Sequence, residues 1–357
     1  MVITFGPVRP VLADTVRFRW QGSDVDGRVV GYYYAVDDST PDNWTDSTEV
    51  MLTGLSFGRH SFYVQACDDS QTRSQAAVWP FVVEFDSAVL PAGTDSTLDI
   101  ATWNIQNFPK LGDSTVSRVR SLVHGLALDL YALQEIEDTI AFRRLLAGLP
   151  GYAGLYSQDD YGSYYQKTAV LYREEVVTVS GVEQLFWEND SFPRPPLKML
   201  VTTRHNGRSF DFGLIVLHLK AGSGFSDRAR RAGACRTLKA YLDSLMAQGP
   251  EQDWIVAGDW NDLLEDPPAE NVFRPFLDDT FNYRFLTRPL AGNPYYSSLL
   301  SGDGIFDHLL VTRDVLDEYA GGITTTLRLD DRLPEYGAVV SDHRPVMATF
   351  PVFTLRH

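Results

Sequence analysis

The sequence lacks the patterns that identify membrane-spanning, disulfide-stabilised or cysteine-ligated zinc proteins. Its two cysteines, Cys67 and Cys235, are too few for a disulfide framework and too far apart for a metal-binding motif. We interpret both as small buried hydrophobic residues. No apolar run approaches the length of a membrane-spanning helix. The first residues, MVITFGPVRP, also lack the basic segment and apolar core of a signal peptide, which leaves the native compartment open because the numbering could begin at a trimmed end.

Positive charge is also scarce. The chain has 31 Lys and Arg residues against 47 Asp and Glu residues, a net charge of −16. Such a chain repels polyanions at long range, so a phosphate-bearing substrate would have to be bound by a local cation or an arginine cluster. Arginine supplies most of the positive charge, which favours bidentate contacts wherever an anion is bound.

The first 88 residues are expected to form a small domain, because a chain of 357 residues is too long for one ordinary core. Short segments of alternating apolar and polar residues follow one another there, separated by turn clusters such as SDVDG and DDSTPDN. This spacing predicts an all-β sandwich, and the pattern resembles a fibronectin type III or immunoglobulin-like module. The expected strands cover residues 15–20, 29–36 and 60–67.

Two features of this domain leave a functional alternative open. Asp24 and Asp26 in SDVDG offer hard oxygens that could bind Ca²⁺, although a tight turn requires the same residue types, and the turn is the favoured interpretation. Tyr32, Tyr33 and Tyr34 could line a carbohydrate or protein surface. Strand alternation favours the simpler reading that one face of this strand belongs to the core.

Residues 89–97 are predicted to be a linker, and residues 98–357 a second domain in which strands alternate with helices. This order predicts the α/β or α+β class, with mixed sheets covered by helices. The expected helices begin at Ser114 or Ser117 and at Ser226, the latter with Ser226 as N-cap and an end near Gln248. The expected strands cover residues 98–103, 129–134, 168–173, 210–217, 254–258, 305–312 and 344–350.

Polar residues stand at the ends of these predicted strands. Asp307 lies near the start of its strand, and Asp342 and His343 precede theirs. Antiparallel neighbours place the carboxyl end of one strand beside the amino end of the next, so all these side chains can share one rim. Four other strands end on a residue that can ligate a metal ion or transfer a proton, namely Asn104, Glu135, His218 and Asp259.

The motif GDWND and the pair of Asp307 with His343 point to hydrolytic chemistry. Asp259 and Asn261 are two residues apart, so in an extended chain they point to one side while Trp260 points away. A carboxylate and an amide held together suit a nucleophilic water, because one accepts its proton and the other orients it. Asp307 and His343 could form a carboxylate–imidazole contact that fixes the tautomer of the ring and raises its basicity.

Glu135 and Asp342 offer oxygen ligands for a divalent cation that keeps several waters and meets a substrate phosphate. Mg²⁺ or Mn²⁺ is therefore the expected cofactor, with Ca²⁺ as a further candidate. The sequence has no pair of histidines at metal-binding spacing and no cysteine cluster, which disfavours zinc.

Between residue 98 and the end, six motifs stand in order: TWN at 102–104, LQEIED at 133–138, VLHLKAG at 216–222, GDWND at 258–262, FDHLLV at 306–311 and SDHRPV at 341–346. Together they resemble the endonuclease/exonuclease/phosphatase superfamily with the DNase I-like fold, and HLKAG most resembles bacterial secreted nucleases. The resemblance implies a four-layered sandwich of two mixed sheets with helices outside, and Mg²⁺- or Mn²⁺-dependent hydrolysis of phosphoesters.

The resemblance also implies a role for each matching residue. Asn104 and Glu135 resemble the metal-binding pair, and Asp259 and Asn261 resemble the group that holds the attacking water. Asp307, Asp342 and His343 resemble the general base and second metal site. His218 resembles the histidine that contacts the scissile phosphate or protonates the leaving oxygen.

One departure from the family pattern concerns the partner of His218. DNase-like members commonly carry a glutamate on the strand that matches YQKTAVLYR, whereas Gln166 and Lys167 stand there in this chain. A histidine without an acidic partner is less readily protonated, which weakens the case for His218 as a general acid. Lys167 is instead a candidate contact to phosphate.

Further candidates for substrate binding follow His218. Lys220, Arg228 and Arg231 lie at or near the start of a predicted helix, where free backbone amides favour anions. A solvated helix face is an equally good interpretation of these charges. Tyr295, in a loop rich in Gly, Pro and Ser, could stack on a base, although loop tyrosines are common without such a function.

These observations predict a metal-dependent phosphodiesterase that hydrolyses nucleic acid, secreted, periplasmic or at the cell surface given the appended sandwich. A phosphatase or lipid phosphodiesterase on the same fold is the first alternative, because a small phosphoester needs no long basic track. A non-catalytic protein that binds a protein or carbohydrate surface through its first domain is the second.

Overall fold

The computed structural model of the chain describes two compact units, one built mainly from residues 1–87 and the other mainly from residues 88–357. The predicted domain boundary at residues 88 and 89 lies outside the described part of the chain. The described residues are 1–8, 11, 16–53, 55, 58–83, 91–158 and 166–354.

The first unit is a sandwich of two antiparallel sheets, as predicted. Phe18 stacks on Phe62 from the other sheet, with ring centroids 4.1 Å apart, and both side chains are fully buried. Tyr32 and Tyr34 face this core, whereas Tyr33 pairs with Trp44 on the opposite face. One sheet has the order β1 (Val2–Phe5), β2 (Val16–Gln21), β5 (Glu49–Leu52), and the other β4 (Asn43–Thr45), β3 (Val29–Val36), β6 (Gly58–Asp68), β7 (Ala77–Val83).

The second unit contains two six-stranded sheets, and both are mixed because β8 pairs with β9 and β14 pairs with β15 in parallel. One sheet has the order β10 (Tyr152–Tyr156), β11 (Lys167–Arg173), β9 (Leu130–Ile136), β8 (Leu98–Phe108), β19 (Val346–Phe350), β18 (Thr324–Thr326). The other has the order β12 (Val177–Gln184), β13 (Leu197–His205), β14 (Arg208–His218), β15 (Trp254–Asp259), β17 (Asp307–Thr312), β16 (Tyr283–Phe285).

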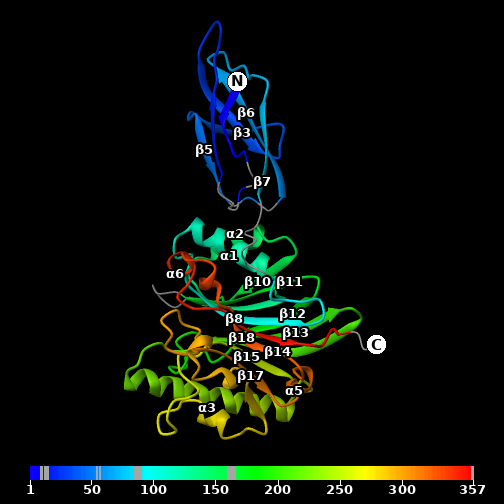
Figure 1. Cartoon of the computed structure of the whole chain (residues 1–357), viewed down its shortest axis with the longest axis vertical. Helices are drawn as coiled ribbons and strands as arrows, with labels where there is room; N and C mark the ends of the chain where they lie inside the picture. Colours follow the sequence, from blue (N-terminus) through cyan, green and yellow to red (C-terminus); the bar gives the residue numbers. More distant parts are fainter. Residues whose placement is uncertain are drawn as a thin grey trace. The chain divides into compact units, whose positions relative to one another are not determined.

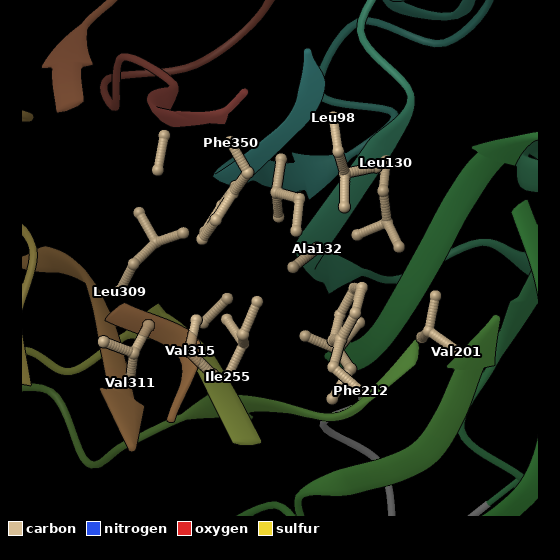
Figure 2. Packing of buried hydrophobic residues seen from close by; sticks show 14 of the residues in the cluster. Leu98, Leu130, Ala132, Val201, Phe212, Ile255, Leu309, Val311, Val315 and Phe350 are labelled. Atoms are coloured by element: carbon tan, nitrogen blue, oxygen red, sulfur yellow. The ribbon is translucent and has the colours of Figure 1, made fainter. Parts of the chain in front are cut away.

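The two sheets of this unit pack face to face around one apolar core. Figure 2 shows Leu98, Leu130 and Phe350 from one sheet pointing toward Phe212 and Leu309 from the other. All five side chains are fully buried. Long apolar strands that are covered on both faces are what such a core requires.

Helices cover the outer faces of these sheets. In Figure 1, α2 lies on the outer side of the first sheet and α3 on the outer side of the second. Leu238 and Leu242 of α3 are fully buried and pack with Trp254 of β15. None of the helices in the described ranges has the length and apolar character needed to cross a membrane. The helical segments are α1 (Asp113–Leu126), α2 (Thr139–Ala147), α3 (Phe225–Gln248), α4 (Arg274–Leu277), η1 (Arg288–Leu290), η2 (Pro294–Tyr296), α5 (Val315–Glu318), η3 (Leu329–Asp331) and α6 (Tyr336–Val339).

The predicted N-cap of α3, Ser226, was wrong by two residues. The N-cap is Gly224, which has the extended conformation that a cap requires (φ −66°, ψ 154°) and makes no side-chain cap bond. Ser226 already lies inside the first turn, so its hydroxyl cannot take the capping role.

Two buried aspartates lie at the amino ends of β8 and β9. The backbone N–H of Asp99 donates to Asp129 Oδ2 at 3.0 Å, and Arg173 Nη1 lies 3.3 Å from Asp129 Oδ1. Burial raises the pKa of Asp99, and burial together with the charge of Asp99 raises the pKa of Asp129 to about 7.

This pair predicts that Asp129→Asn stabilises the second unit at alkaline pH. Because the folded pKa of Asp129 is about 7 and the unfolded value about 4, its ionisation lowers the free energy of unfolding as the pH rises between these values. We expect the variant to melt roughly 3 °C higher than the wild type at pH 8, with a smaller advantage at pH 5. Calorimetry at both pH values tests this, with the exposed Asp211→Asn as control; a pH-independent difference would contradict it.

Candidate active site

The register of the second sheet places three predicted residues in one row. His218 of β14 lies opposite Asp259 of β15 in parallel register, and Asp259 lies opposite Asp307 of β17 in antiparallel register. All three side chains are buried. His218 Nε2 is 3.4 Å from Asp259 Oδ2 and 3.8 Å from Glu135 Oε1.

Asp307 holds the ring of His343. Its Oδ2 lies 2.7 Å from His343 Nδ1, which is the carboxylate–imidazole contact expected from the sequence. His343 Nε2 then lies 4.0 Å from Asp259 Oδ2. Asp307 Oδ1 is buried and has no hydrogen-bond partner among the described residues.

Asn104 connects the two sheets at this rim. Its Nδ2 donates to Glu135 Oε1 of its own sheet and to Asp259 Oδ2 of the other sheet, both at 3.0 Å. Its Oδ1 accepts a hydrogen bond from the backbone of Gln106. One buried amide therefore fixes the position of two carboxylates.

The backbone near Glu135 is strained. Glu135 has φ 65°, in the left-handed region that residues with a side chain rarely adopt, and Gln106 and Asn107 also have positive φ. The backbone N–H of Asn107 donates to Glu135 Oε2 at 2.9 Å. Strained positions of this kind persist only where the surrounding contacts hold them, and they concentrate at functional sites.

Asp259 and Asn261 meet by a turn, not by an extended strand as predicted. The strand ends at Asp259, and Asn261 has φ 55° with its N–H donating to Asp259 Oδ1 at 3.0 Å. Its Nδ2 donates to the carbonyl of Leu219. Trp260 points away and is fully buried behind the sheet, as expected. The turn forms because the aspartate side chain bonds the amide two residues on.

Burial and the charged groups of the cluster shift the pKa values of its members. Burial and the charge of Asp307 raise the pKa of Asp259 to about 7. Burial lowers the pKa of His343, but the charges of Asp307 and Asp259 outweigh it and raise the value to about 10. Burial holds the pKa of His218 well below its ordinary value, and the charge of Arg194 adds to this effect. In the chain alone, His343 therefore carries a proton and His218 is neutral.

The donor set fits a divalent cation. One ligand atom each from Asp259, Asp307 and His343 lies within 4.8 Å of the others, and Asp307 Oδ1 is a buried acceptor without a partner in the described ranges. Carboxylate oxygens of Glu135 adjoin this group through Asn104. The carboxylate oxygens of this group suit Mg²⁺ or Mn²⁺, whereas the ring of His343 is bonded to Asp307 and, while protonated, offers no ligand atom. Asp342 is exposed and acts on the cluster through its charge, which raises the pKa of His343.

Arg194 is a cation near His218 that the sequence did not reveal. It lies between prolines in SFPRPP, and its Nη2 donates to Gln166 Oε1. His218 Nδ1 is buried without a hydrogen-bond partner within the described ranges. Lys167 is buried, with its Nζ 5.9 Å from the ring centroid of Tyr156.

The predicted basic residues after His218 are engaged within the protein. Lys220 Nζ lies 3.2 Å from Asp227 Oδ1, and Arg228 bonds Glu270. Arg231 is buried, with Nε donating to Asp262 Oδ2 at 2.8 Å and Nη1 donating to the carbonyl of Lys220 at 2.8 Å. Arg231 therefore holds the loop after His218 and does not present its charge at the surface.

Three further residues position His343, and sequence analysis assigned none of them a role. Ser341 Oγ donates to the carbonyl of Asn104 at 2.7 Å and accepts from the N–H of His343 at 2.9 Å. The hydroxyl of Tyr336 donates to the carbonyl of His343 at 2.6 Å. Arg344 binds both oxygens of Asp330 at 2.7 Å. In the segment SDHR, Ser341 and Arg344 therefore fix the backbone on both sides of His343.

Tyr295 lies on η2 and is 60% exposed, three residues before Ser298. Ser298 Oγ accepts hydrogen bonds from the N–H groups of Phe306 at 2.9 Å and Asp307 at 3.3 Å.

His308, next to Asp307, faces the other side of the sheet and bonds Thr287, as expected of an ordinary strand residue.

Residues 101–343 match the profile of the Endonuclease/Exonuclease/phosphatase family. The chain belongs to this family. Its members are phosphoric ester hydrolases that generally depend on a divalent metal ion, and the chain is accordingly classed as such an enzyme. A comparison with curated proteins finds no match.

Solved structures of family members share the fold of the second unit. The catalytic domain of human Nocturnin with bound sulfate is 18% identical with a TM-score of 0.50, covering 71% of this chain and 94% of that one. D. rerio TDP2, humanized by 14 mutations, is 14% identical with a TM-score of 0.51, covering 71% and 99%. An endonuclease/exonuclease/phosphatase from Bacteroides vulgatus is 17% identical with a TM-score of 0.51, covering 71% and 98%.

The arrangement predicts that Glu135→Gln weakens metal binding. The amide keeps the size of the side chain and removes one negative charge from the cluster, so affinity for Mn²⁺ should fall at least about 10-fold. Calorimetric titration with Mn²⁺ measures this effect. Glu137→Gln, an exposed carboxylate two residues away, is the matched control. Equal Mn²⁺ affinity in Glu135→Gln and the wild type would remove Glu135 from the metal site.

Proposed function

We propose that this enzyme is a divalent-metal-dependent phosphodiesterase that hydrolyses nucleic acid, DNA and RNA included, by in-line attack of water. The observation that carries the proposal is the meeting of Glu135, Asp259, Asp307 and His343 at one rim, from strands of both sheets. The resemblance of HLKAG to bacterial secreted nucleases supports the nucleic-acid substrate.

Glu135 and Asp307 would hold the cation, which when bound would supply positive charge to a non-bridging oxygen of the phosphate. Asp259 accepts a proton from the attacking water, and its raised pKa suits it to that task. Asn261 lies against Asp259 through its N–H and orients the same water. The new bond forms between the water oxygen and phosphorus, while the bond from phosphorus to the leaving oxygen breaks and that oxygen takes a proton from solvent water.

His218 and Arg194 suit the contact with the scissile phosphate. His218 is neutral, and its Nε2 faces Asp259 and Glu135, so a ring with its hydrogen on Nε2 would donate to an oxygen bound at this rim. A neutral donor stabilises a phosphate oxygen but does not supply a proton to the leaving group, which favours the first of the two roles that the family resemblance allows. Arg194 adds a positive charge beside it.

The first unit is proposed to bind a protein or carbohydrate surface in a secreted, periplasmic or cell-surface enzyme. Trp44 is 49% exposed, and its ring meets Tyr33 on the outer face of the sheet with centroids 4.9 Å apart. Exposed aromatic pairs of this kind are typical of contact surfaces.

A panel of substrates with Mg²⁺, with and without EDTA, tests the activity. We expect hydrolysis of plasmid DNA and RNA, loss of this activity with EDTA, and recovery on addition of excess Mg²⁺. Inositol phosphates and sphingomyelin are the comparison substrates. Hydrolysis of these alone would replace the nuclease proposal by a phosphatase or a lipid phosphodiesterase.

His343→Ala is expected to lower kcat at least about 100-fold, because the ring both neutralises Asp307 and faces Asp259. Its thermal unfolding should change little in comparison. Turnover and the melting midpoint are measured together, with His205→Ala, at the end of β13, as control. Wild-type turnover in His343→Ala would overturn the assignment of this cluster as the active site.

A further inference from the structure

Tyr295 presents a rigid aromatic ring to solvent. Its side chain is 60% exposed, although the nearby Ser297 and Ser298 are fully buried. The guanidinium of Arg328 lies 4.9 Å from the ring centroid, and Tyr296 meets the ring at 90° with centroids 5.2 Å apart. Two neighbours therefore fix the orientation of the ring while much of it stays accessible.

The backbone that carries this ring is fixed as well. The N–H of Tyr295 donates to the side chain of Asn293 at 3.1 Å, which caps η2. Arg328 Nη1 donates to the carbonyl of Tyr295 at 3.0 Å, and its other nitrogens bind both oxygens of Asp331 at 2.8 and 2.9 Å. A paired guanidinium of this kind is held in one geometry.

A closed set of contacts connects the ring to the active site. Asp330, next to Asp331 on η3, binds Arg344, the residue after His343. Arg344 Nη1 donates to the carbonyls of Ser297 at 2.9 Å and Leu299 at 3.0 Å. The turn that holds Arg328 thus also holds the residue beside the catalytic histidine.

The chain length sets how far the ring lies from the cluster. Ser298, whose hydroxyl accepts from the N–H of Asp307, lies three positions after Tyr295. A fully extended chain spans about 3.4 Å per residue, so the two Cα atoms lie within about 10 Å of each other. The backbone that carries the ring is therefore tied closely to the segment that holds Asp307.

We propose that Tyr295, backed by Arg328, is a stacking platform for a nucleobase next to the scissile phosphodiester. This inference rests on the proposed function and names a subsite for it. The faces of all bases stack on aromatic rings, and a cation behind the ring strengthens such contacts. A protein with a net charge of −16 does not attract a polyanion at long range. Stacking on Tyr295 would therefore supply binding affinity that long-range electrostatics does not supply.

The polar surroundings favour a base over a lipid tail. Arg328 lies over the ring, Asn293 bonds the backbone N–H of Tyr295, and Asp331 pairs with Arg328. None of these three side chains offers an apolar wall for an acyl chain. A flat base needs only the ring face and can leave its polar edges in water.

The test compares an oligonucleotide with one of equal length that lacks bases at every position. Loss of a stacked base contact in Tyr295→Ala should raise KM for the normal oligonucleotide about 10-fold and leave KM for the abasic one unchanged. Tyr295→Phe should behave as the wild type. Tyr295→Leu keeps a bulky side chain without a ring, and it should resemble Tyr295→Ala.

Phe281→Ala is the matched control. Phe281 is 69% exposed, with the guanidinium of Arg313 4.0 Å from its ring centroid. Arg313 follows the carboxyl end of β17, six residues and roughly 20 Å along the strand from Asp307. This variant should leave both KM values unchanged.

The outcomes separate the two proposals. If the wild type cleaves neither oligonucleotide, the proposed nuclease function fails and the subsite fails with it. If the wild type cleaves both and Tyr295→Ala matches it on both, the subsite alone is wrong. Equal losses on the normal and abasic substrates, or wild-type behaviour in Tyr295→Leu, would also overturn the stacking role.

Discussion

The site depends on the burial of carboxylates that lie directly beside one another. Asp259 and Asp307 face each other across two strands at 1% and 0% exposure. Removing such charges from water costs on the order of several kcal/mol each unless they are paired. The imidazolium of His343 and the amide of Asn104 offset part of this cost. Asp307 Oδ1 keeps no partner within the described ranges, so negative charge remains uncompensated, which is the physical reason to expect a divalent cation there.

The packing of the two sheets holds this charge cluster in place. Asn104 and Asp259 are 155 residues apart, on different sheets, and their hydrogen bond can form only if the apolar core sets the spacing between the sheets. Mixed pairing then decides which strand ends meet. Parallel β14 and β15 bring His218 beside Asp259, while antiparallel β17 enters from the other direction and places Asp307 at the start of its strand. An all-parallel sheet could not bring together these ends and starts.

The sequence predicted the strands and the rim because both follow from local patterns. Apolar runs mark the buried strands, and a polar residue that closes such a run marks the rim. The conformation of Glu135 could not be predicted, since its positive φ occurs where the pairing of β8 with β9 is irregular and does not follow from its residue type. Ser341 was missed for another reason: its partner Asn104 lies 237 residues away, and no local pattern encodes such a contact. Arg231 has the residue type of a phosphate-binding residue, but it is buried against Asp262 and instead positions the loop after His218.

The net negative charge of the protein, and the pairing of its buried arginines with internal carboxylates, together limit how a phosphate substrate can be bound. Arg231 and Arg344 are buried on internal carboxylates, so their charges are already neutralised. Arg194 donates a hydrogen bond to a neutral amide, Gln166, and its positive charge adds to the effect of burial on the pKa of His218. Burial and this charge outweigh the two carboxylates nearest to His218 Nε2, Asp259 at 3.4 Å and Glu135 at 3.8 Å, and keep the ring neutral in a protein with a net charge of −16.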